Sequence, residues 1–180
     1  MTVRVVGIHG IGNCQAGRTP DDAAAILGRR WTPAVRQGLG TGSQVEAVVA
    51  YYAHHLAGDT AQGVGDPAQL TDPEQQLLLG WAHALGAPTE VAQGRLTQPA
   101  RAAANWIAKE FGLDHALVRL LVATSCREVN RYLTDPDRRA AVRDTVADTI
   151  GRERPRVVLA HSLGSVVAYE TLWARADLEV

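Results

Sequence analysis

The chain is poor in several residue types, and each shortage excludes a class of protein. Two cysteines in 180 residues are too few for a disulfide framework, which favours a reducing compartment. The formal net charge of -1 gives no basic excess of the kind that binds nucleic acid. No apolar run approaches the ~20 residues of a membrane span, and the N-terminus lacks the pattern of a signal peptide. We therefore expect a cytoplasmic protein with no nucleic-acid partner and no membrane span.

Metal and nucleotide motifs are also missing. The sequence contains neither C-x-x-C nor H-E-x-x-H, and the adjacent His54 and His55 would point to opposite faces of a strand. The glycines at Gly10 and Gly12 do not continue as G-x-G-x-x-G, because the sixth position is Gln15, and there is no G-K-[ST]. We expect no metal site and no bound nucleotide.

Three short apolar segments are typical of strands in a parallel sheet covered by helices. They are Val3–Ile8, Val45–Tyr52 and Arg156–Ala160, and each is rich in β-branched or other apolar residues. Helical patterns separate them, which implies right-handed crossovers. The predicted fold class is α/β, with one parallel sheet and helices on both faces in three layers.

Helix starts are marked by proline after a capping side chain. Pro20, Pro73 and Pro136 each follow a threonine or an aspartate and precede acidic residues near the positive end of the helix dipole. Asp72 and Gln75 also have the spacing of a capping box. These signals predict helices from about residues 20, 73 and 136.

The stretch of residues 56–131 is too long for a single crossover between strands. Gly58–Thr71 is rich in glycine, aspartate and proline and is predicted to be a loop, and apolar helical fragments follow it. We expect one incomplete domain over residues 1–180, with 56–131 forming either a helical insertion or a cap over an apolar substrate site.

The strongest chemical signal is a serine directly after the third predicted strand. Ser162 is flanked two positions away by the small residues Ala160 and Gly164, close to the G-x-S-x-G nucleophile elbow. Such an elbow exposes the hydroxyl on a strained strand-to-helix turn. Leu163 would be the first residue of the following helix, and its backbone N–H is a candidate oxyanion donor. His161, as the immediate neighbour of the serine, should point away and support the site structurally.

A second motif follows the first predicted strand. His9-Gly10-Ile11-Gly12 is a glycine-rich loop of the kind that can turn backbone N–H groups toward an anion. Ile11 N–H is the natural second oxyanion donor. His9 could act as a base, but a structural role is favoured.

With both motifs in this order, the chain resembles the α/β-hydrolase superfamily, in its lipase and esterase group. The resemblance implies that Ser162 is the nucleophile and that the N–H groups of Ile11 and Leu163 form the oxyanion hole. It implies hydrolysis of an ester, thioester or lipid-like small-molecule acyl substrate through an acyl-enzyme, with no metal or organic cofactor.

One departure from that family is severe, because no histidine follows Ser162 in this sequence. Glu170 and Asp177 do follow it, but neither occupies the late loop in which the family places its acid. We expect the catalytic acid and base beyond residue 180. The alternatives are a non-catalytic binding or regulatory module and one half of a split enzyme. A sheet that ends at the nucleophile strand would leave an exposed edge available for pairing.

Overall fold

The computed structural model describes residues 2–40, 42, 44–58, 66–92 and 98–180. It is a mixed α/β structure that divides into two compact units. The first unit comprises residues 1–57 and 136–180, and the second comprises residues 58–135. Within the described residues, no helix has both the length and the apolar character needed to cross a membrane.

The first unit is built on a parallel sheet of three strands in the order β2-β1-β3. The strands are β1 (Val3–Ile8), β2 (Val45–Ala50) and β3 (Val157–Ala160). All three predicted strands are therefore confirmed, although β2 ends two residues earlier than expected. The pairing aligns Ile8 with Ala50 on one side and with Ala160 on the other, so the carboxyl ends of all three strands meet at one edge.

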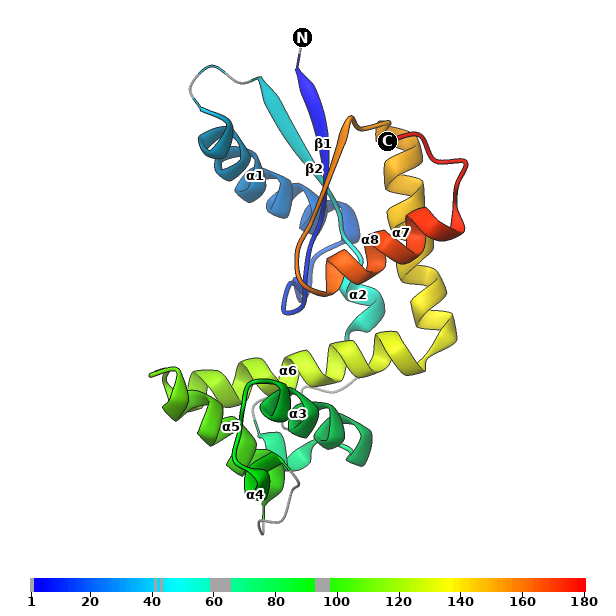
Figure 1. The fold of residues 1–180 in the computed structure, drawn as a ribbon. Helices are drawn as coiled ribbons and strands as arrows, with labels where there is room; N and C mark the ends of the chain where they lie inside the picture. The colour runs from blue at the N-terminus through cyan, green and yellow to red at the C-terminus, as the bar shows by residue number, and fades with distance from the viewer. Residues whose placement is uncertain (1, 41, 43, 59–65, 93–97) are drawn as a thin grey trace. The chain divides into compact units, whose positions relative to one another are not determined.

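Helices cover both faces of this sheet (Figure 1). On one face, α1 (Pro20–Leu39) contacts β2 and places the Trp31 ring over Gly7, where a Cβ would lie 2.6 Å from that ring. On the other face, α7 (Pro136–Glu153) contacts β1 and β2, and α8 (Leu163–Ala174) contacts β1 and β3. A short helix, α2 (Ala53–Leu56), follows β2. The starts predicted at Pro20 and Pro136 are confirmed.

The two edge strands of the sheet differ in how far other elements cover them. The outer backbone of β2 is capped by α1: Thr32 Oγ1 accepts the N–H of Ala47 at 3.0 Å, and Arg36 Nε donates to the carbonyl of Val45 at 2.8 Å. By contrast, β3 was expected to be covered on both faces, and it is not. Val157 is 43% exposed and Leu159 is 36% exposed, because they share the face of β3 that α1 does not reach.

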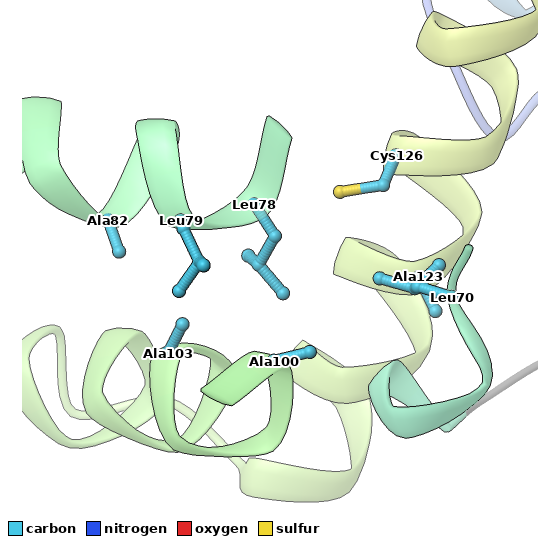
Figure 2. Close-up of a cluster of buried hydrophobic side chains, with 8 residues drawn as sticks. All are labelled: Leu70, Leu78, Leu79, Ala82, Ala100, Ala103, Ala123 and Cys126. Atoms are coloured by element: carbon cyan, nitrogen blue, oxygen red, sulfur yellow. The ribbon is translucent and has the colours of Figure 1, made fainter. Parts of the chain in front are cut away.

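The second unit is helical. Its described residues form three longer helices and two short ones: η1 (Pro67–Gln69), α3 (Asp72–Ala84), α4 (Thr89–Ala92), α5 (Pro99–Glu110) and α6 (His115–Thr134). Their shared core joins leucines of α3 to small side chains of α5 and α6 (Figure 2). The apolar fragments predicted within residues 56–131 lie in these helices. Of the loop predicted over Gly58–Thr71, residues 59–65 lie outside the described residues, and η1 occupies part of the remainder.

The cap of α3 differs from the prediction. Thr71, not Asp72, is the N-cap, and its backbone N–H donates to Glu74 Oε2 at 2.9 Å. The capping box is thus Thr71 with Glu74 rather than Asp72 with Gln75. Asp72 instead occupies the first helical position, ahead of the proline, where its charge still faces the positive end of the dipole.

Candidate active site

The two sequence motifs meet at the carboxyl edge of the sheet. The loop His9–Gly12 follows β1, and the turn at His161 and Ser162 follows β3, the strand beside it. His161 extends the ladder by one residue, because its N–H donates to the carbonyl of Ile8 at 3.1 Å. In open α/β sheets this edge is where ligands bind. The register of the strands therefore brings together motifs that are about 150 positions apart.

Ser162 has the strained turn geometry expected of an elbow. Its φ is 56° and its ψ is -128°, a conformation that L-residues rarely adopt and that costs about 1–3 kcal/mol. The chain leaves β3 at Ala160, reverses at Ser162 and enters α8 at Leu163. Ser162 is exposed, and the carbonyls of His161 and Ser162 accept the N–H groups of Gly164 and Ser165. This turn places the Ser162 hydroxyl in solvent at the start of a helix.

Glycines at two positions make the close approach of the motifs sterically feasible. A Cβ on Gly164 would lie 2.4 Å from the carbonyl oxygen of Ile8 and 2.5 Å from that of His9. A Cβ on Gly10 would lie 2.7 Å from Ser162 Cβ. The small residue after the serine is therefore needed because α8 begins against the end of β1, not against β3. Ala160 is exposed, so the substitution of alanine for the first glycine of the motif is accommodated.

The backbone donors predicted for an oxyanion hole lie on these two segments. In the described part of the chain, neither Ile11 N–H nor Leu163 N–H donates to a protein acceptor. Leu163 is the first residue of α8, so its N–H belongs to the set that a helix leaves unpaired. Gly12 has a φ of 72°, which fits its predicted role, whereas Gly10 is required for space rather than for a positive φ.

The loop that carries Ile11 is fixed by an amide side chain. Asn13 Nδ2 donates to the carbonyl of Gly10 at 3.0 Å and to the carbonyl of Ile11 at 3.1 Å. These bonds turn both carbonyls toward Asn13 and thereby limit rotation of the peptide units on either side of Ile11. Asn13 is a positioning residue that the motif analysis did not single out.

His9 is buried beneath the loop and is held through both ring nitrogens. Its Nε2 accepts the backbone N–H of Tyr52 at 3.2 Å, so the proton resides on Nδ1, which lies 2.8 Å from the carbonyl of Gly10. The Tyr52 ring stacks on the imidazole at 4.1 Å, and its hydroxyl donates to the His9 carbonyl. Burial lowers the pKa of His9 from 6.5 to about 4. With no free lone pair, His9 is placed to support the loop rather than to accept a proton.

The other histidines of this unit do not supply a base in this arrangement. His161 is exposed, and His54 and His55 lie on α2. His55 Nε2 lies 2.9 Å from Thr145 Oγ1 of α7, and burial together with nearby positive charge lowers its pKa. Among the described residues, no hydrogen bond joins a histidine nitrogen to Ser162 Oγ.

A cavity of about 340 Å³ lies beside the histidine pair at the end of β2. Side chains of α1, α2 and α7 line it, among them His54, His55 and Thr145, but Ser162 does not. No group of three or more histidine, cysteine or acidic residues in the described ranges could hold a metal ion there or elsewhere. Its lining mixes polar and apolar side chains and contains no residue of the serine turn.

The acidic residues that follow Ser162 are engaged elsewhere. Glu170 on α8 makes a two-pronged ion pair with Arg139 of α7, with one bond at 2.9 Å from Arg139 Nε. Asp177 is bound by Arg175 through two contacts of 2.9 Å. Neither carboxylate contacts a histidine in these bonds. The described residues thus contain an exposed serine on a strained turn and two unpaired backbone N–H groups on the adjoining segments, and these two carboxylates are not paired with a histidine beside it.

Two supporting residues, Asn13 and Tyr52, were missed from the sequence. Asn13 directly follows the glycine loop, and an asparagine at that position is a local signal for side chain–backbone bonding. Tyr52 lies 43 residues from His9, so only the strand register reveals the contact.

Comparisons with known proteins add no relative: neither the family models, nor the curated proteins, nor the solved structures contain a match to this chain. The structure itself shows a parallel sheet with helices on both faces, and at the carboxyl edge of this sheet a glycine loop lies against a strained serine turn.

Proposed function

We propose that this chain carries the nucleophile half of a serine hydrolase of the esterase and lipase type, with the α/β-hydrolase fold. The observation that carries the proposal is the approach of Gly10 to Ser162, where a Cβ on the glycine would lie 2.7 Å from the serine Cβ. The positive φ of Ser162 and the unpaired N–H of Leu163 support the same assignment. The substrate class is an ester, thioester or lipid-like acyl group.

The proposed chemistry proceeds through an acyl-enzyme. Ser162 Oγ attacks the carbonyl carbon while its proton passes to a histidine base, and the N–H groups of Ile11 and Leu163 stabilise the resulting oxyanion. The bond from the carbonyl carbon to the leaving oxygen, or to the leaving sulfur of a thioester, then breaks as that atom takes the proton from the histidine, and water hydrolyses the acyl-serine by the same steps. The acid and base are proposed to come from polypeptide beyond residue 180. If the reading frame continues, we expect an aspartate or glutamate followed by a histidine.

The test is covalent labelling of Ser162 with a fluorophosphonate at pH 9, mapped by mass spectrometry. We expect slow labelling of the wild-type chain, because the turn and donors alone retain ~10³–10⁴-fold acceleration in triad-deleted enzymes. Ser162→Ala should abolish the label. Ser165→Ala is the matched control, since Ser165 is an exposed serine one turn along, and it should label like the wild type. Labelling elsewhere, or none above the rate of the Ser162→Ala variant, would contradict the proposal.

A second candidate function is a non-catalytic binding or regulatory module. It is favoured by one observation, namely that His9 is locked and Glu170 is held by Arg139, so that no acid–base pair is offered to the serine. Under this alternative, Ser162→Ala would leave ligand binding and all other measured properties unchanged.

A further inference from the structure

The glycine loop after β1 is held by two kinds of hydrogen bond. Within the loop, the Asn13 side chain binds the carbonyls of Gly10 and Ile11, and these bonds fix the shape of the loop. A further bond leaves the loop, because the backbone N–H of Gln15 donates to the Tyr51 hydroxyl at 2.9 Å. The two residues are 36 positions apart in the sequence. This bond therefore fixes where the loop lies relative to the sheet, which the Asn13 bonds alone do not.

Tyr51 is itself held firmly at the end of β2. It directly follows that strand, which pairs with β1, the strand that leads into the loop. Tyr51 is 5% exposed and belongs to a buried cluster with Ala23 and Leu27 of α1. Its ring stacks on His54 and also lies near His9, with ring centres 5.5 Å apart in both pairs. A side chain enclosed on these sides has little freedom to move, so its hydroxyl is a fixed anchor.

Packing alone does not account for the hydroxyl of Tyr51. Phenylalanine would fill the same core, and burying a hydroxyl costs free energy unless it forms hydrogen bonds. The N–H of Gln15 lies in irregular backbone, outside the sheet and the helices, so its partner must come from elsewhere in the structure. The bond between them satisfies both groups. It also acts close to the proposed site, because Gln15 is four residues after Ile11.

We propose that Tyr51 is a positioning residue for the oxyanion hole, which keeps the N–H of Ile11 in place beside Ser162 by anchoring the loop at Gln15. This inference rests on the proposed function of Ser162. Tyr51 acts through the loop rather than on the reacting atoms. The anchor joins the end of β2 to the loop after β1, and β2 lies on the opposite side of β1 from β3. It is therefore complete without any polypeptide beyond residue 180.

The first test compares the rates at which a fluorophosphonate labels Ser162 at pH 9 in Tyr51→Phe and in the wild type. The variant keeps the ring and loses the oxygen that accepts from Gln15. We expect labelling to be ~3–10-fold slower, because the loss of one hydrogen bond displaces one of the two oxyanion donors. Tyr132→Phe is the matched control, since Tyr132 is also buried but lies on α6 in the second unit, and it should label at the wild-type rate.

Amide proton signals of the labelled chain separate positioning from a general loss of stability. In the labelled wild type, the phosphonyl oxygen should move the N–H signals of Ile11 and Leu163 downfield, because both groups donate to it. In labelled Tyr51→Phe, the Leu163 signal should still move, since Leu163 belongs to the turn after β3. The movement of the Ile11 signal should shrink, because only the loop has lost its anchor.

Hydrogen exchange tests the anchor without any variant. In the unlabelled wild type, the Gln15 amide should exchange more slowly than that of Ile11, which donates to no protein acceptor in the described ranges. Equal exchange of these two amides, equal labelling of Tyr51→Phe and the wild type, or equal Ile11 shifts in the two labelled chains would overturn the inference and leave the proposed function standing. A wild-type chain that labels no faster than Ser162→Ala would overturn the proposed function, and this inference with it.

Discussion

The buried histidine beneath the glycine loop makes stability depend on pH. His9 is 1% exposed and its pKa falls from 6.5 to about 4, chiefly because burial disfavours the charged form. In the unfolded chain the imidazole regains its ordinary pKa, so below pH 6.5 the unfolded state binds a proton that the folded state does not. The stabilisation is complete above pH 6.5 and is lost as pH falls toward 4. The full difference is worth about 3 kcal/mol, of which about 2 kcal/mol is lost between pH 7.5 and pH 5.

The measurement is the free energy of urea unfolding at pH 7.5 and pH 5, compared between the wild type and His9→Asn. Asparagine retains a donor near the position of Nδ1 for the Gly10 carbonyl but does not titrate. Titrating carboxylates affect both proteins alike, so the difference between the two pH dependences isolates His9. We expect the wild type to lose about 2 kcal/mol more than the variant over this interval.

An NMR titration checks the same reasoning without unfolding the protein. The ring carbon signals of His9 should shift with a midpoint near 4, and ring nitrogen shifts should identify the Nδ1–H form required by the Tyr52 contact. Parallel pH dependences of wild type and variant, or a His9 midpoint near 6.5, would refute the claim that this imidazole is buried and locked.

Three further changes follow from single contacts. Gly164→Ala should destabilise the first unit severely, because the new Cβ would lie 2.4 Å from a β1 carbonyl oxygen. Gly80→Ala in α3 is the control, because its Cβ would meet nothing within 4 Å, and it should raise the free energy of unfolding by about 0.5–1 kcal/mol. Thermal unfolding of both variants measures the difference. Asn13→Ala should slow fluorophosphonate labelling of the serine, and Asn13→Ser, which restores one donor, should partly recover it; equal labelling rates would remove the positioning role. Burial raises the pKa of Cys126 to about 12, so iodoacetamide at pH 8 should modify only Cys14 in the folded chain and both thiols in urea.

The features that the sequence predicted correctly are those encoded over a few neighbouring residues. Three β-branched runs became the three strands, and proline after a capping residue marked the starts at Pro20 and Pro136. The strained turn at Ser162 was also local, because it depends on small residues and on the strand and helix patterns beside it. The cap of α3 was placed one residue late, since threonine and aspartate are both good caps and Glu74 decided between them.

The features that escaped prediction depend on register between distant segments. The contact of Tyr52 with His9 requires β2 to pair with β1, and the need for glycine at position 164 arises from β1 rather than from the strand that precedes it. The bare face of β3 was missed because Val157 and Leu159 have the composition of a buried strand, and composition does not reveal whether α1 extends far enough to cover them.

The partly uncovered strand β3 ends two residues before Ser162, so the strand edge and the serine turn are adjacent. The backbone groups of Ala160 face away from β1, because those of His161 face toward it, so any strand that pairs with β3 ends or begins beside the serine turn. Pairing would also restrict the turn, because it would fix the backbone on both sides of Ala160. If the reading frame continues beyond residue 180 as proposed, fluorophosphonate labelling of Ser162 should therefore be faster in the longer chain than in residues 1–180 alone. Equal labelling rates in the two chains would show that covering the edge of β3 does not affect the reactivity of Ser162.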